Sequence, residues 1–110
     1  MGKEAGKAAP NKDIDIDGYR ERVAEAVGIA VSELSAQGRD NPQLVMLRMV
    51  AAYLLFARDH LLVVDIARIM NRKESNVRYA TDYIERRMSR YYAFKVYIEQ
   101  TMATYALASK

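Results

Sequence analysis

The sequence predicts an all-α fold, a helical bundle with a helix-turn-helix core and an extra C-terminal helix. Apolar residues recur at three- and four-residue steps through most of the chain, which is the spacing of amphipathic helices. Hydrophobic residues make up 51% of the composition and only two residues are proline, as suits a compact helical domain. Residues 61–88 have the pattern of a short helix, a tight polar turn and a longer basic helix.

The overall composition limits the classes of function. At 110 residues the chain is one domain with a single core. No apolar run approaches the roughly 20 residues that span a bilayer, and no apolar segment follows the N-terminal lysines as in a signal peptide. With no cysteine and one histidine, His60, thiolate and histidine metal sites are excluded. We therefore expect no membrane association, no metal or cofactor and no enzymatic activity.

The sequence of the N-terminal part of the chain indicates a tail that is followed by the first helix. Residues 1–13 are rich in Gly, Ala and Lys without apolar periodicity, so we expect a disordered tail ahead of one folded domain, residues 14–110. Asp17 is the expected N-cap, and the helix should end near Ala36, with Gly38 as its stop. Its apolar positions are Tyr19, Val23, Val27, Ala30, Val31 and Leu34.

The second predicted helix runs from about residue 42 to residue 58. Pro42 suits its first position, where no backbone N–H is needed. The apolar face is wide, which predicts the central helix of the bundle; it comprises Leu44, Leu47, Val50, Ala51, Leu54 and Leu55. Arg48 is the one charge between Gln43 and Arg58, and helical spacing permits it to lie on the polar stripe.

The helix-turn-helix pattern occupies residues 61–88. Its short helix should bury Val64, Ile66, Ala67, Ile69 and Met70. Asn71 tolerates the left-handed conformation that ends a helix, and Ser75 is a candidate N-cap for the longer helix. That helix has an apolar stripe of Val77, Ala80, Ile84 and Met88, and a polar face of Asn76, Arg78, Tyr79, Asp82, Arg86 and Arg87. An ordinary helical hairpin with a solvated charged face is the alternative.

Basic charge is concentrated in the second part of the chain. Residues 1–67 carry eight Lys or Arg and ten Asp or Glu, whereas residues 68–110 carry nine and four. Such asymmetry indicates a face that meets a polyanion, most plausibly nucleic acid, although a solvated surface has the same composition.

The C-terminal stretch, residues 89–108, continues an apolar pattern. Ile84, Tyr91, Ile98 and Tyr105 repeat every seven residues. This stretch either continues the preceding helix, packs as a separate helix, or forms a two-stranded coiled coil between copies. We favour a helix packed on the first helix, whose apolar face needs a cover. Tyr91 and Tyr92, close to Arg86, Arg87 and Arg90, suit stacking on single-stranded bases, but tyrosines at this spacing are more often core.

Two motifs stand close together within residues 42–88. The segment Arg48-Met49-Val50-Ala51-Ala52-Tyr53-Leu54 has the pattern R-x-x-A-x-Y-L. A second motif follows it, formed by Ile66, Ala67, Met70, Asn71, Arg72, Ser75, Val77 and Ala80. In both motifs residues 42–88 resemble the C-terminal DNA-binding domain of the bacterial chromosomal replication initiator DnaA. The resemblance implies a helix-turn-helix that binds duplex DNA, with Arg48 reaching the DNA backbone or the adjacent minor groove.

The turn departs from the family at three positions. Lys73, Glu74 and Asn76 stand where that family has aspartate, histidine and its second threonine. Lysine prefers the acceptors of guanine, glutamate accepts from cytosine, and asparagine grips adenine bidentately. We therefore expect a base preference different from the initiator's. The 110 residues include no ATPase module, so a small transcription or replication regulator is the expected class.

Double-stranded DNA binding is thus the function that the sequence predicts, in the cytoplasm and associated with the nucleoid. Arg72 and Arg78 should anchor phosphates, with Tyr79 on the same face. Lys73, Glu74, Ser75 and Asn76 should face base edges. The alternatives are a protein-interaction module whose basic helix docks an acidic partner, and a homodimer formed through residues 89–108.

Overall fold

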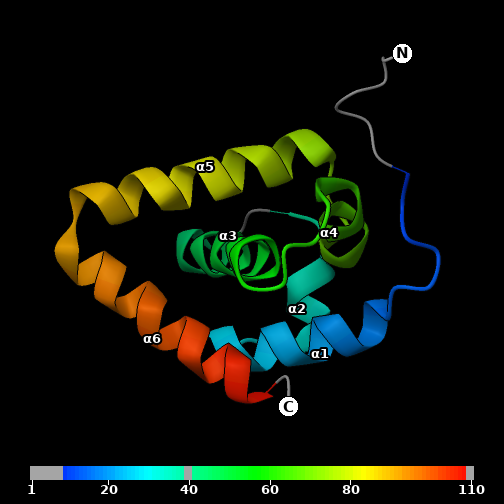
Figure 1. The fold of residues 1–110 in the computed structure, drawn as a ribbon, viewed down its shortest axis with the longest axis horizontal. Coiled ribbons are helices and arrows are strands. Elements are labelled where there is room, and N and C mark those ends of the chain that lie inside the picture. Colours follow the sequence, from blue (N-terminus) through cyan, green and yellow to red (C-terminus); the bar gives the residue numbers. More distant parts are fainter. Residues whose placement is uncertain (1–8, 39–40, 109–110) are drawn as a thin grey trace.

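The computed structural model describes residues 9–38 and 41–108, and within these ranges it is all-α (Figure 1). The described part of the chain contains six helices and no strand. The helices are α1 Ile16–Val27, α2 Val31–Ser35, α3 Pro42–Ala57, α4 Val63–Met70, α5 Glu74–Arg90 and α6 Tyr92–Ala108. The predicted fold class is confirmed.

Helix α3 lies at the centre of the bundle. In Figure 1 it is seen nearly end-on, with α5, α6, α1 and α4 arranged around it. Its start is fixed by Asn41, whose side-chain oxygen accepts from the backbone N–H groups of Gln43 (2.8 Å) and Leu44 (3.4 Å), with Pro42 at the first position. Its buried apolar residues are Val50, Ala51, Ala52, Tyr53, Leu54 and Leu55. The wide apolar face therefore has the predicted role, because neighbours cover it on several sides.

The single helix predicted up to Ala36 is wrong, since the chain forms two helices there. Gly28 has a φ of 84°, and its N–H donates to the carbonyl of Ala24 at 2.8 Å, which closes α1. The chain then starts α2, whose Leu34 still reaches the core. The N-cap is Asp15 rather than Asp17: its carboxylate accepts from the N–H of Gly18 at 3.0 Å.

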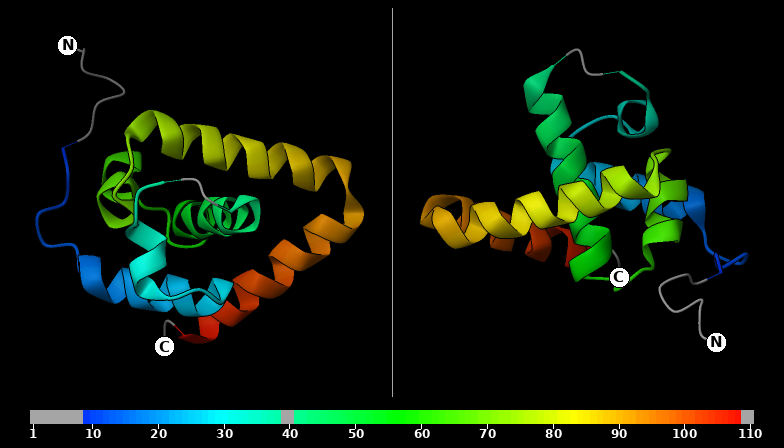
Figure 2. Two further views of the ribbon diagram at one scale, coloured as in Figure 1. Left: turned by 180° about the vertical axis from the view of Figure 1, so that it is seen from behind. Right: turned by 90° about the horizontal axis from the view of Figure 1, so that it is seen from above.

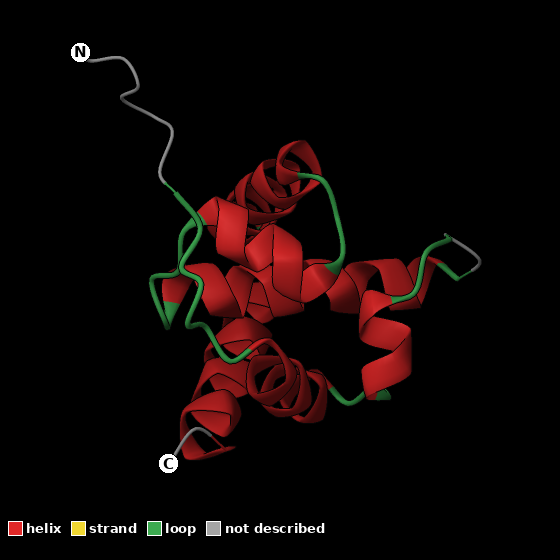
Figure 3. Cartoon of the chain, turned by 90° about the vertical axis from the view of Figure 1, so that its right-hand side faces the viewer, coloured by secondary structure: helices red, strands yellow, loops and turns green. Residues whose placement is uncertain are grey.

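Helices α4 and α5 form the predicted helix-turn-helix (Figure 1), and every regular element of the described chain is a helix (Figure 3). Asn71 ends α4 with a φ of 55°, the left-handed conformation expected of it. Helix α5 begins at Glu74, so Ser75 lies inside its first turn and is not the N-cap; Lys73 holds that position without a side-chain bond. Buried residues Val77, Ala80, Thr81 and Ile84 face the core, while Met88 is half-buried.

The C-terminal stretch is a separate helix. The chain leaves α5 at Tyr91 (φ −126°, ψ 111°) and turns back, so that α6 runs beside α1 (Figures 1 and 2). Ile98 and Tyr105 of the seven-residue repeat are fully buried in the chain's own core. The predicted packing on the first helix is confirmed, and a continuation of the preceding helix is wrong. A coiled coil between copies would have to expose these two residues.

The hydroxyl of Tyr105 closes the contact between α6 and the end of α3. It donates to the carboxylate of Asp59, just beyond that helix. Burial, followed by this hydrogen bond, raises the pKa of Tyr105 well above its usual value.

Residues ahead of α1 contact α4. The N–H of Asn11 donates to the buried carboxylate of Asp65 at 3.0 Å, and Arg68 donates to the carbonyl of Asn11 at 2.9 Å. The expected disorder of residues 1–13 therefore does not hold at Asn11, while residues 1–8 lie outside the described part. None of the helices in the described ranges has both the length and the apolar character needed to cross a membrane.

Candidate nucleic-acid interface

The first turn of α5 presents four consecutive exposed side chains, Lys73, Glu74, Ser75 and Asn76. The next residue, Val77, is 2% exposed and is inserted in the core. Because a helix has 3.6 residues per turn, burial of Val77 and Ala80 fixes which way the first turn faces. The turn therefore projects from the bundle on a rigid base, as a docking helix requires.

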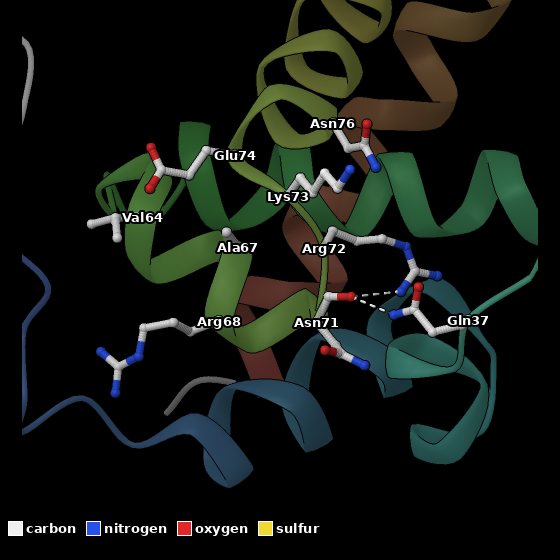
Figure 4. Close-up of a pocket in the computed structure, with 9 residues that line it drawn as sticks. All are labelled: Gln37, Val64, Ala67, Arg68, Asn71, Arg72, Lys73, Glu74 and Asn76. Carbon is white, nitrogen blue, oxygen red and sulfur yellow. Dashed lines mark hydrogen bonds between the residues drawn. The ribbon is translucent and has the colours of Figure 1, made fainter.

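A hollow of about 670 Å³ extends over this turn (Figure 4). Its lining residues are Gln37, Val64, Ala67, Arg68, Asn71, Arg72, Lys73, Glu74 and Asn76. Three of them, Arg68, Arg72 and Lys73, are cations, against one carboxylate, Glu74. The backbone N–H groups at the start of α5 add partial positive charge. The hollow is therefore suited to an anionic partner.

Arg72 braces the turn from within. Its guanidinium donates to the carbonyls of Met70 (3.1 Å), Asn71 (3.1 Å) and Ala36 (2.5 Å). Burial, followed by the nearby positive charge of Arg48, lowers the pKa of Arg72, although a guanidinium remains protonated. From the sequence, Arg72 was expected to bind a DNA phosphate. In the structure, its guanidinium instead makes three hydrogen bonds to backbone carbonyls of the protein.

Two amide side chains extend this brace between the turn and the end of α2. Gln37 donates from Nε2 to the carbonyl of Asn71 at 2.7 Å, and Asn71 donates from Nδ2 to the carbonyl of Ser35 at 3.0 Å. Figure 4 shows Gln37 and Arg72 meeting at the same carbonyl. Residues more than 30 positions apart thus hold the left-handed conformation of Asn71.

Arg48 is almost completely buried beside the predicted DNA-facing surface, where it lines a hollow of about 590 Å³ together with Arg72, Asn76 and Tyr79. It is 8% exposed, and it donates to the carbonyls of Glu33 (2.8 Å) and Gly38 (3.1 Å). These bonds fasten α2 and the residues after it to α3. The expected contact with the DNA backbone or the minor groove does not fit this position, and neither does a place on a solvated polar stripe. The reason is that the guanidinium is itself buried and donates to these two backbone carbonyls.

Arg78 and Tyr79 lie one turn further along α5, and both are exposed. Arg78 forms an ion pair with Glu74 across one helical turn at 3.4 Å. Tyr79 stacks on Tyr83, with ring centroids 6.0 Å apart and ring planes 20° apart. Arg78 therefore lies next to the exposed residues 73–76, and Tyr79 lies on the side of Arg78 that is nearer the C-terminal end of α5.

Sequence reasoning missed Gln37 and Arg68 as parts of this surface. Gln37 follows α2, and nothing in its local sequence indicates that it folds back onto the turn. Arg68 was detectable in principle, because it is the basic residue in the last turn of α4. Its guanidinium also contacts Asp65 at 3.1 Å, which orients it.

Among the described residues, no three His, Asp or Glu side chains come together in a group that could hold a metal ion. The sequence matches no protein-family model, and no curated protein matches it.

Proposed function

We propose that this chain binds double-stranded DNA by inserting the first turn of α5 into the major groove, as a small transcription or replication regulator. The observation that carries the proposal is the projecting turn, residues 73–76, held on a helix-turn-helix by the burial of Val77 and the Arg72 brace. The resemblance of residues 42–88 to the DNA-binding domain of the replication initiator supports the same function.

Phosphate contacts come from the edge of the turn. Arg68 lines the hollow on the α4 side, and Arg78 lies one turn along α5. Arg78 is released at little cost, because an exposed ion pair spaced four residues apart on a helix contributes only about 0.3–0.5 kcal/mol. A DNA phosphate therefore replaces Glu74 as the partner of Arg78 without a large penalty. Arg72 adds positive charge but acts mainly by positioning the turn.

Base contacts come from the tip of the turn. Lys73 and Asn76 suit the acceptors of guanine and the edge of adenine, respectively. Glu74, once released from Arg78, accepts from the amino group of cytosine. The base preference therefore depends on residues that differ from those in the initiator family.

Salt dependence of duplex binding tests this proposal. A fluorescently labelled duplex should bind at about 50 mM salt and be released as salt rises, with a slope of about −0.9 per phosphate contacted. Replacing Lys73 by alanine should weaken binding, whereas Lys95→Ala removes the same charge from an exposed position of α6 and should change it little. Equal losses for both variants would indicate attraction by net charge alone, and no anisotropy change at micromolar protein would refute the proposal.

A further inference from the structure

A second basic surface follows the exposed side of α5 to its junction with α6. Six residues line a hollow of about 370 Å³ there: Tyr79, Tyr83, Arg86, Arg87, Arg90 and Tyr91. We call these six residues the tyrosine–arginine surface. It contains only phenol rings and guanidinium groups, with no carboxylate and no aliphatic side chain in its lining. The exposed residues of this surface belong neither to the first turn of α5 nor to the core, so neither explains why tyrosine and arginine gather there.

The tyrosine rings of this surface are accessible. Tyr79 is 59% exposed and Tyr91 is 52% exposed, although tyrosines at this helical spacing are usually core residues. Tyr105, by contrast, is fully buried, so the chain separates a core tyrosine from surface tyrosines. Tyr79 is held in a stack with Tyr83. The exposed rings are thus presented in fixed orientations and are not loose side chains.

Arg87 organises the part of the surface near the helix junction. Its guanidinium carbon lies 5.3 Å from the ring centre of Tyr91 and 5.0 Å from that of Phe94, and it donates to the Tyr83 hydroxyl at 3.3 Å. Its buried Nε has no hydrogen-bond partner among the described residues. The arginine therefore fixes rings from both α5 and α6, and it places a positive charge behind them.

Arg86 and Arg90 supply charge on the outer side of the surface. Arg90 is exposed, and Arg86 pairs with Asp82 across one helical turn at 3.0 Å, with both side chains more than 60% exposed. An exposed pair of this kind is easily exchanged for another anion. The surface therefore offers exchangeable cations beside oriented aromatic rings.

We propose that the tyrosine–arginine surface binds single-stranded nucleic acid, with bases stacked on Tyr79 and Tyr91 and phosphates on Arg86 and Arg90. Aromatic platforms within a basic groove are the way proteins hold single strands without reading sequence. A duplex does not use this chemistry, because its bases are stacked on each other. An acidic protein partner would pair with the arginines but leave the exposed rings without a function.

The surface is distinct from the duplex-binding turn. Helix α5 has 17 residues, so its two ends are about 25 Å apart. Lys73 lies at one end, Arg90 and Tyr91 lie at the other, and Tyr79 lies between them. The two binding activities can therefore be separated by substitutions at opposite ends of the helix.

The test uses the full chain and three labelled strands of about 15 nucleotides, a length within known single-strand site sizes: oligothymidine, oligouridine and an abasic strand with the same phosphates. We expect oligothymidine to bind on the order of tenfold more tightly than the abasic strand, since stacking needs bases. Comparison of oligothymidine with oligouridine shows which of these two strands, which differ in the sugar and in the methyl group of the base, is preferred. The chain contains eight tyrosines and no tryptophan, so the quenching of tyrosine fluorescence that is lost in Tyr91→Ala reports stacking on Tyr91.

Matched variants separate stacking from charge. Tyr91→Ala should weaken oligothymidine binding on the order of tenfold, and Tyr91→Phe, which keeps the ring, should stay close to the parent. Arg90→Ala should flatten the salt slope by about 0.7, the value for one phosphate of a single strand. Thermal melting followed by circular dichroism verifies that each variant is folded.

The outcomes distinguish this proposal from the proposed function. Lys73→Ala should weaken duplex binding and leave single-strand binding intact, and Tyr91→Ala should do the reverse. Equal affinity for the abasic strand and oligothymidine would overturn the single-strand proposal, as would unchanged binding by folded Tyr91→Ala. If the parent chain bound oligothymidine but no duplex, only the proposed function would be refuted.

Discussion

Arginine side chains in this protein serve two purposes that their sequence context does not distinguish. Arg48 and Arg72 donate to backbone carbonyls of residues that α2 and the segment after it bring close. Arg78 and Arg90 remain exposed on α5. Whether a guanidinium faces a phosphate or a carbonyl depends on chain segments that fold back from elsewhere, here Ala36, which lies 36 positions before Arg72. The local sequence therefore identifies the arginines but does not tell which of them donate to backbone carbonyls and which remain exposed.

Arg72→Lys tests the bracing role. Lysine keeps the positive charge but lacks the planar fork that reaches three carbonyls at once. We expect the free energy of unfolding to fall by about 0.5–1.5 kcal/mol, because lysine cannot make all three bonds, while water can reach the carbonyls of the two bonds that are exposed. Urea denaturation measures this change. The control Lys73→Ala, at an exposed position, should stay within about 0.5 kcal/mol; equal stability of Arg72→Lys and the parent would contradict the brace.

Tyr105→Phe tests the contact between α6 and Asp59. Removing the hydroxyl leaves a largely buried carboxylate without this donor, so we expect a loss of about 1–3 kcal/mol in the free energy of unfolding. Tyr97→Phe, at an exposed position on the same helix, is the matched control. A Tyr105→Phe variant as stable as that control would show that the hydroxyl contributes nothing.

Buried tyrosines also predict a dependence of stability on alkaline pH. Burial raises the folded-state pKa of both Tyr105 and Tyr53 above the unfolded-state value near 10. Their stabilising contribution is therefore complete below about pH 10, and it is lost as pH rises towards the folded-state pKa values. Denaturation of the parent chain and Tyr105→Phe between about pH 8 and 11 checks this. An equally steep decline in both proteins would exclude Tyr105 as a cause.

Helices were predictable where apolar periodicity continued, and their ends were predictable only where a local residue fixed them. Asn41 with Pro42, and Asn71, marked helix boundaries correctly. The break at Gly28 was missed because the apolar spacing continues through it. A separate helix after α5 is favoured because the first helix needs a cover, but its exact start beyond Tyr91 was not predictable, since no glycine or proline separates α5 from α6. That turn is set by packing of α6 on α1, which no local pattern reports.

Gly28→Ala tests whether the break between α1 and α2 is set by the backbone. An added Cβ meets nothing within 4 Å, so no clash opposes the change. The φ of 84°, however, is costly for alanine, and we expect about 1–2 kcal/mol of destabilisation. Thermal or urea denaturation measures this loss, with Gln100→Ala at an exposed position of α6 as the control. A gain in stability would mean that α1 and α2 can merge into the single helix that periodicity predicts.

The whole domain is closed by α6, which covers α1 while α3 occupies the centre (Figure 1). Removing residues 91–110 uncovers the partners of Ile98 and Tyr105, and each large apolar side chain contributes about 1.5–3 kcal/mol. Because small domains are stable by about 5–15 kcal/mol in total, the truncated chain should lose most of its cooperative unfolding transition. Circular dichroism melting measures this. Cooperative melting at the parent temperature would instead make α6 an independent arm.

The candidate site was predictable in outline only. The projecting turn, Lys73 to Asn76, was identified from the helix-turn-helix pattern and is exposed as expected. Local sequence did not reveal the supporting layer, formed by Gln37, Arg48 and Arg72, because these side chains act across segments distant in the chain.

Mapping the duplex interface on the isotopically labelled full chain is the strongest test of whether the first turn of α5 enters the groove. Backbone amide resonances would be followed by nuclear magnetic resonance while a random-sequence duplex is added at low salt. We predict shifts concentrated in residues 71–79 and at Gln37, the surface around the start of α5. Shifts confined to residues 86–98, or spread evenly over the basic residues of the chain, would contradict insertion of this turn into the groove.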